Sequence, residues 1–180
     1  MLPLTIDPMP IPNQVINLVS NRPPITPASA GFEVKNDQWV SSSFQTGNAS
    51  NVHVISSVTL RFGQFTSGSL FVKLYSGSGS PNTEIMNFNV PSIGGTNNYE
   101  FTLTSPQLLT ANTTYWLVAG VSIGSGRYFW AKTDSTVETG LTGWLIGDQA
   151  IFSNDQGASN IWGVFSGSGP FQFSINGQSY

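Results

Sequence analysis

The chain has 180 residues, of which only 8% are charged, 39% are hydrophobic and 12% are aromatic. The net charge of −3 excludes a nucleic-acid binder that relies on a positive surface, and the aromatic content excludes an intrinsically disordered chain. Cysteine is absent, which excludes a disulfide scaffold, and no apolar run is long enough for a membrane-spanning helix. We expect one main folded domain.

The N-terminal segment is rich in proline and apolar residues. Residues 1–27 hold seven of the eleven prolines and only two charged residues, Asp7 and Arg22. Proline fixes φ and lacks a backbone donor, so we expect neither a helix nor a central strand here. We predict that residues 1–30 form an extended arm that docks onto a neighbouring subunit or a larger assembly, the alternative being that it folds back along its own domain. The candidate docking side chains are Leu2, Leu4, Ile6, Met9, Ile11, Val15, Ile16 and Leu18.

From Gly31 onward, short apolar runs alternate with clusters of Gly, Ser and Asn. Val58, Leu60 and Phe62 alternate with polar residues in SSVTLRFG, a period of two that is typical of a strand. We predict for residues 31–180 an all-β fold, an antiparallel jelly-roll-like β-sandwich of about 8–10 strands. The expected strands are 39–46, 52–62, 69–76, 84–90, 98–104, 114–122, 127–133, 143–151, 160–165 and 171–175.

Residues suited to catalysis are few, and we expect no enzyme. The single histidine, His53, lies in a predicted strand, and the chain contains no G-x-S-x-G motif to support a catalytic triad. The pairs Glu33/Asp37 and Asp134/Glu138 are four residues apart, which on a strand separates the two carboxyls by about 13 Å, too far for glycoside hydrolysis.

No cofactor is expected, and the loop sequence GDQAIFSNDQG holds the only weak metal candidates. Asp148 and Asp155 in this stretch could bind a structural calcium ion, but calcium takes six to eight oxygen ligands. We therefore interpret the stretch as a polar hairpin loop.

Four aromatic residues next to glycine-rich turns are the remaining candidates for ligand contact: Tyr128, Trp130, Trp144 and Trp162. Packing in the core or at its rim is the favoured interpretation. The alternative is contact with a carbohydrate or a protein, because such rings offer large amphipathic faces.

Six segments of the sequence carry a family resemblance. In chain order they are QWVSSSFQTG, SSVTLRFG, LFVKLYSGSGSPNTEI, LTANTTYWLVAG, YFWAKTDSTVETGLTGWLIGD and GPFQFSING. With them the region Gln38–Gly177 resembles the bacterial choice-of-anchor R domain, a secreted β-sandwich module common in cyanobacterial surface proteins. The resemblance implies the sandwich fold, but the family has no assigned activity or catalytic residues.

Members of that family usually carry a signal peptide and a C-terminal sorting helix, and neither pattern is visible in this sequence. We therefore expect a non-enzymatic structural protein of a phage virion, such as a capsid cement or decoration protein or a fibre knob. Its partner would be a capsid, tail or fibre protein or a neighbouring subunit, in a homo-oligomer. The alternative is a secreted module of the cell surface or extracellular matrix that binds protein or a surface glycan.

Overall fold

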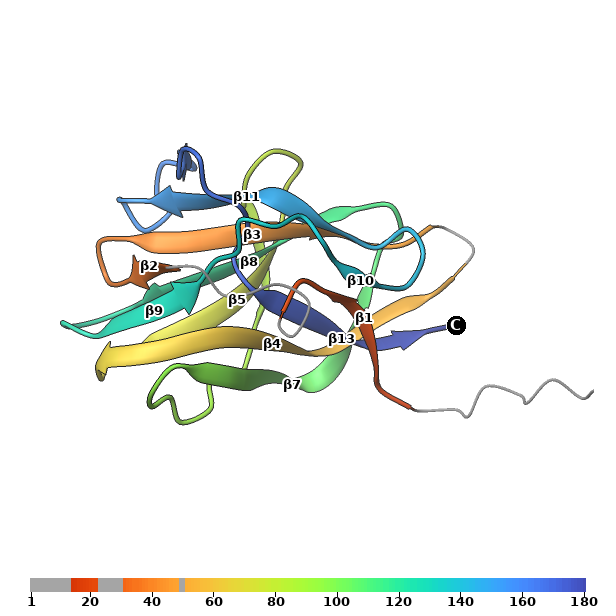
Figure 1. Cartoon of the computed structure of the whole chain (residues 1–180), viewed down its shortest axis with the longest axis horizontal. Coiled ribbons are helices and arrows are strands. Elements are labelled where there is room, and N and C mark those ends of the chain that lie inside the picture. The colour runs from red at the N-terminus through yellow and green to blue at the C-terminus, as the bar shows by residue number, and fades with distance from the viewer. Residues whose placement is uncertain (1–13, 23–30, 49–50) are drawn as a thin grey trace, which may run out of the picture.

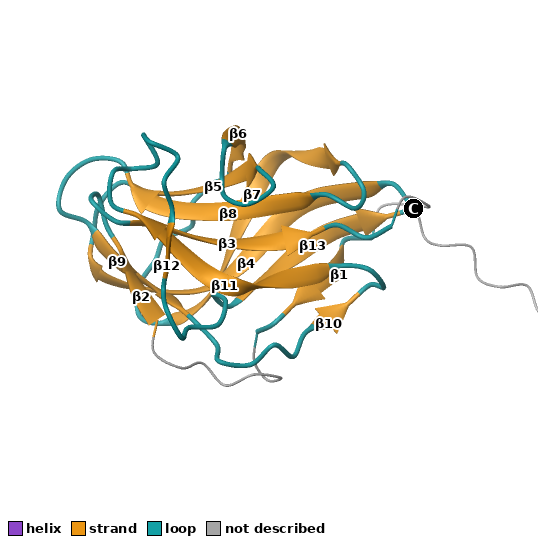
Figure 2. Cartoon of the chain, turned by 90° about the horizontal axis from the view of Figure 1, so that it is seen from above, coloured by secondary structure: helices purple, strands orange, loops and turns teal. Residues whose placement is uncertain are grey.

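The protein is a two-layer β-sandwich, seen here in a computed structural model that describes residues 14–22, 31–48 and 51–180. Figures 1 and 2 show two antiparallel sheets packed face to face. The described residues form strands and loops only. Accordingly, this part of the chain offers no helix with the length and apolarity to cross a membrane. The predicted β-sandwich is confirmed.

The first sheet has seven strands. Six follow the order β10 (Thr139–Gly140), β1 (Ile16–Ser20), β13 (Phe173–Ser179), β4 (His53–Thr66), β9 (Arg127–Ala131) and β2 (Gly31–Val34). The seventh strand, β7 (Asn97–Leu109), pairs with β4. The 14-residue strand β4 organises this sheet because β13 pairs with its first half and β9 with its second.

The second sheet has six strands. Their order is β12 (Gly163–Val164), β11 (Leu145–Ser153), β3 (Trp39–Gln45), β8 (Thr114–Val121), β5 (Leu70–Ser76) and β6 (Thr83–Asn87). Strand β8 lies in the middle of the sheet, and seven of its eight residues are buried. This explains why its sequence, TYWLVAGV, is almost continuously apolar instead of alternating.

The core fills the space between the two sheets. The inward side chains of β4 are Val58, Leu60 and Phe62, as their alternation in the sequence predicts, and all three are fully buried. Phe62 packs against Phe101 of β7 and Trp130 of β9. Burying such apolar area stabilises the fold by about 25 cal/mol per Å².

The structure corrects the expectation for the end of the N-terminal segment. Residues 16–20 form β1, which pairs with β13 on one side and β10 on the other. The stretch from residue 13 to residue 22 contains no proline, so nothing prevents it from pairing in a sheet. Leu18 is 0% exposed in the core, which contradicts its assignment as a docking side chain.

The strand pairings define the two ends of the sandwich. Ile16 pairs with Gly177, and Tyr180 pairs with Val52, so residues 14–16 and the C-terminal residue lie at one end. Val34 pairs with Tyr128, and Thr66 pairs with Arg127 at the opposite end, as Figure 1 shows for β2, β9 and β4. The end with residues 14–16 and Tyr180 is called here the terminal end, and the opposite end is called the loop end.

Candidate functional site

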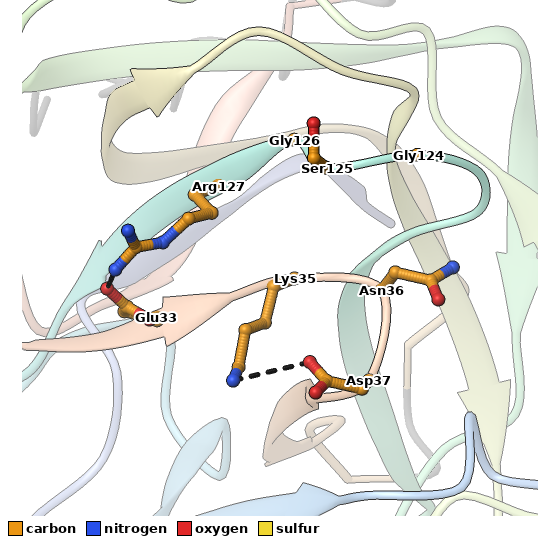
Figure 3. A pocket seen from close by; sticks show the side chains of 8 residues that line it. All are labelled: Glu33, Lys35, Asn36, Asp37, Gly124, Ser125, Gly126 and Arg127. Atoms are coloured by element: carbon orange, nitrogen blue, oxygen red, sulfur yellow. Dashed lines mark hydrogen bonds and ion pairs between the residues drawn. The ribbon is translucent and has the colours of Figure 1, made fainter.

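A polar groove of about 440 Å³ opens at the loop end, between the turn that joins β2 to β3 and the loop that joins β8 to β9. Figure 3 shows its two walls. Glu33, Lys35, Asn36 and Asp37 form the first wall, and Gly124–Arg127 form the second. The groove contains four charged residues, which is a high concentration in a chain that is only 8% charged.

Two ion pairs bring these four charges to the groove. Arg127 donates a hydrogen bond to Glu33 across the groove, although the two residues are 94 positions apart in the chain. Lys35 Nζ lies 3.3 Å from Asp37 Oδ1 within the first wall. Both pairs are drawn as dashed lines in Figure 3. Two cations and two anions leave the groove with no net charge.

Asn36 ties the two walls together. Its side-chain amide donates hydrogen bonds of 3.1 Å to the backbone carbonyl oxygens of Val121 and Ser122, just before the second wall. Its Oδ1 accepts a hydrogen bond from Gln156 in the loop between β11 and β12. Three loops are therefore joined through one side chain, which fixes the shape of the groove before any ligand arrives.

Glycine is required at two positions of the second wall. Gly124 has a φ of +85°, a conformation that other residues rarely adopt. A Cβ on Gly126 would lie 2.7 Å from the Cα of Gly68, so only glycine lets the loop after β4 pack against this wall. The hydroxyl of Tyr128 secures the same contact by donating to the Gly68 carbonyl and accepting from the Gly68 N–H.

Two large apolar side chains lie exposed beside the groove. Phe65, near the end of β4, is 62% exposed, and the Arg127 guanidinium lies 6.0 Å from the centre of its ring. Ile123, next to Gly124, is 75% exposed. The loop end thus combines hydrogen-bonding groups with accessible apolar surface, as binding sites often do.

The predicted ligand-facing aromatics do not form a site. Tyr128, Trp130 and Trp144 are buried, and only Trp162 is half-buried. Trp130 stacks on Phe171 and donates to the backbone oxygen of Gln172. Trp144 packs parallel to Phe44 and edge-on against His53. The ligand-facing alternative is wrong for these three residues: strand alternation in β9 points Tyr128 and Trp130 into the sandwich, and Trp144, just before β11, is covered by Phe44 and His53.

His53 is buried and has backbone and hydroxyl partners. Its Nε2 lies 3.1 Å from the carbonyl oxygen of Asn48, which identifies Nε2–H as the donor. Its Nδ1 then accepts from the hydroxyl of Ser179 at 3.3 Å. The partners of the ring are thus a backbone carbonyl and a hydroxyl, whereas a catalytic triad orients its histidine with a carboxylate at Nδ1.

The two calcium candidates lie in different surroundings. Asp155 accepts hydrogen bonds from Ser153 and Ser159, and these interactions lower the pKa of its carboxyl. Asp148 is exposed beside Glu138. Among the described residues, no group of three or more His, Asp or Glu side chains could hold a metal ion. Asp155 instead shapes its own loop.

The terminal end exposes an apolar surface, called here the apolar patch and formed by Val15, Val52, Leu108 and Tyr180. Val52 pairs with Tyr180, and Leu108 pairs with Val54, so Val52, Leu108 and Tyr180 share the outer face of the sheet. Ile16 pairs with Gly177 opposite the buried Ile55 and therefore belongs to the inner face. Residues 14–21, 51–56, 104–113 and 175–180 around it contain no Asp, Glu, Lys or Arg. The predicted docking residues Leu2, Leu4, Ile6, Met9 and Ile11 lie outside the described residues.

No family model matches the chain, and neither the curated proteins nor the solved structures contain a match to it. The similarity to the choice-of-anchor R domain therefore rests on the sequence segments alone and stays a prediction.

Proposed function

We propose that this protein is a non-enzymatic attachment protein, held in a larger assembly by its terminal end and exposing its loop end. The observation that carries the proposal is the separation of two different surfaces. The apolar patch lies where residues 14–16 enter the sandwich, and the polar groove lies at the opposite end. A protein fixed by one end leaves the other free to bind.

The chemistry of the terminal end supports docking to protein. Exposed apolar side chains that are grouped together are typical of protein interfaces, whereas single ones are common on any surface. The residues that precede the patch in the chain add Leu2, Leu4, Ile6, Met9 and Ile11. An uncharged, apolar surface on a capsid, tail or fibre protein, or on a neighbouring subunit, would complement them.

We propose a virus particle as the assembly, with the sandwich as a capsid decoration or fibre-tip subunit. The alternative is a secreted module of a bacterial cell surface, which the resemblance of the six segments to the choice-of-anchor R domain favours. Both settings need a stable sandwich that is attached at one end. His53 is buried with a backbone carbonyl and a hydroxyl as its partners, and these surroundings support a role other than catalysis.

A deletion separates docking from folding. Residues 1–13 precede β1, so their removal should leave the sandwich folded, as circular dichroism can verify. In cells that produce the assembly, the full chain should sediment with particles in a density gradient, and the shortened chain should remain at the top. Arg127→Ala, a change at the loop end, is the matched control and should still sediment with particles. Particles that retain the shortened chain in full would refute docking through residues 1–13.

A further inference from the structure

We propose that the groove between the β2–β3 turn and the β8–β9 loop binds a neutral oligosaccharide. This proposal does not depend on the docking role of the terminal end. Charge is distributed unusually in this protein. The side chains of Glu33, Lys35, Asp37 and Arg127 meet in one groove of a chain with few charged residues.

The charge balance of the groove selects a neutral ligand. Each cation faces a carboxylate, in the pairs Arg127–Glu33 and Lys35–Asp37. A phosphate or carboxylate ligand would meet two anions, and a metal ion or amine would meet two cations. The paired charges therefore produce no field that attracts ions of either sign.

The hydrogen-bonding groups match the hydroxyls of a sugar. A hydroxyl can donate to a carboxylate and accept from an ammonium or guanidinium group at the same time. Exposed ion pairs contribute little to stability, so a hydroxyl can enter between the partners at small cost. Asp37 supplies the most accessible acceptor, since its side chain is 74% exposed.

Phe65 gives the groove an apolar neighbour. Its exposed ring lies next to Arg127 and edge-on to Phe129, which holds it in place. Sugar rings have one face covered by C–H groups, and aromatic rings bind such faces by excluding water. A disaccharide or longer chain can place one unit in the groove and the next against Phe65.

The turn of the first wall offers a peptide ligand no free backbone groups at Lys35. An extended peptide binds by adding its backbone to an open strand edge. At this turn the N–H and C=O groups of Lys35 already bond to the C=O and N–H groups of Gln38. At Lys35 recognition therefore falls to the side chains of the turn, whose charged groups suit sugar hydroxyls.

The test uses the full chain on an array of neutral and anionic oligosaccharides, followed by calorimetry with the neutral glycan that binds best. We expect binding to a neutral glycan that changes little with salt concentration, because no net charge is neutralised. Arg127→Ala and Asp37→Ala should each lower the affinity by roughly tenfold or more, since each removes a charged hydrogen-bonding group.

A matched control and a second measurement complete the test. Glu84→Gln disrupts the ion pair Lys73–Glu84, which lies away from the groove, and should leave affinity unchanged. Circular dichroism shows whether each variant is folded. Absence of binding to every neutral glycan, binding restricted to anionic glycans, or equal affinity of a folded Arg127→Ala variant would each overturn the proposal. A peptide that binds in the groove, when no glycan does, would also overturn the proposal.

Discussion

The indole of Trp130 lies nearly parallel to the ring of Phe171, with their centres 4.5 Å apart and their planes at 16°. Both residues are fully buried, and the contact joins β9 to the segment that leads into β13. The buried indole N–H is satisfied by the backbone oxygen of Gln172 at 3.0 Å. This pair is therefore a structural element of the core.

Replacing Trp130 by Ala should lower the free energy of unfolding by about 3–5 kcal/mol, because it leaves a large cavity in the core. Urea denaturation followed by circular dichroism measures the change. Trp162→Ala is the comparison, and its effect should be clearly smaller because Trp162 is only half-buried. Equal losses in the two variants would contradict the placement of Trp130 in the core.

Leu18 and Leu108 allow a matched test of the terminal end. Leu18 is 0% exposed in β1, whereas Leu108 is 61% exposed in β7. Leu18→Ala should destabilise the protein by about 2–5 kcal/mol, and Leu108→Ala should change stability by less than about 0.5 kcal/mol. Thermal unfolding of both variants measures this difference. A stable Leu18→Ala variant would mean that β1 contributes little to the sandwich.

The sequence predicted most of the strands because their side chains alternate between core and solvent. Val58, Leu60 and Phe62 illustrate this, and all three are buried. Strand β1 was missed because the prolines on both sides of it dominated the interpretation, although the strand itself contains none. Strands β2 and β10 are too short, at four and two residues, to show a period.

The groove could not be predicted, because it forms only when distant segments meet. Glu33 and Arg127 are far apart in the chain, and pairing of β2 with β9 brings them together. For some aromatic residues, the sequence does indicate which way the side chain points. Tyr128 and Trp130 are two residues apart in β9, so strand alternation places both on one face, and that face is the buried one.

Asn36→Ala should loosen the second wall of the groove. It removes the hydrogen bonds to the carbonyl oxygens of Val121 and Ser122, each of which contributes about 1 kcal/mol. Hydrogen exchange of the backbone amides in residues 122–126, followed by mass spectrometry, should become faster. Gln156→Ala, which removes only the bond to Asn36 Oδ1, should have a weaker effect. Unchanged exchange in Asn36→Ala would show that the wall is held by other contacts.

Glu138 should make stability depend on pH in the acidic range. Burial raises the pKa of Glu138 above 4.5 in spite of the hydrogen bond from the Ile146 N–H, and nearby Asp148 also raises it. The folded protein then holds this proton more tightly than the unfolded chain does. Its contribution to stability is fully present below pH 4.5 and is lost as the pH rises through the folded pKa.

Glu138→Gln should therefore be more stable than the wild type at neutral pH, and the difference should disappear below pH 4.5. Glutamine keeps an oxygen that can accept from the Ile146 N–H, a bond of 2.7 Å in the wild type. Urea midpoints of both proteins at neutral and acidic pH provide the measurement. A stabilisation that grows toward acidic pH would have the wrong sign for this mechanism.

Tyr75 should resist ionisation until strongly alkaline pH. Burial raises the pKa of Tyr75 from 10.0 to about 12, and the charge of Glu84 and its hydrogen bond with the Tyr75 hydroxyl act in the same direction. Because the unfolded chain loses this proton first, stability should be unaffected by Tyr75 up to pH 10 and should fall as the pH approaches 12.

The ultraviolet absorbance of tyrosinate, taken as the difference between the wild type and Tyr75→Phe, isolates the titration of this one residue. Glu84→Gln should lower the pKa of Tyr75 but keep it above 10.0, because burial remains as the first cause. Lys73, which binds Glu84 at 2.8 Å, loses its ionic partner in the same variant. A pKa that returns fully to 10.0 in Glu84→Gln would assign the whole effect to the carboxylate and none to burial.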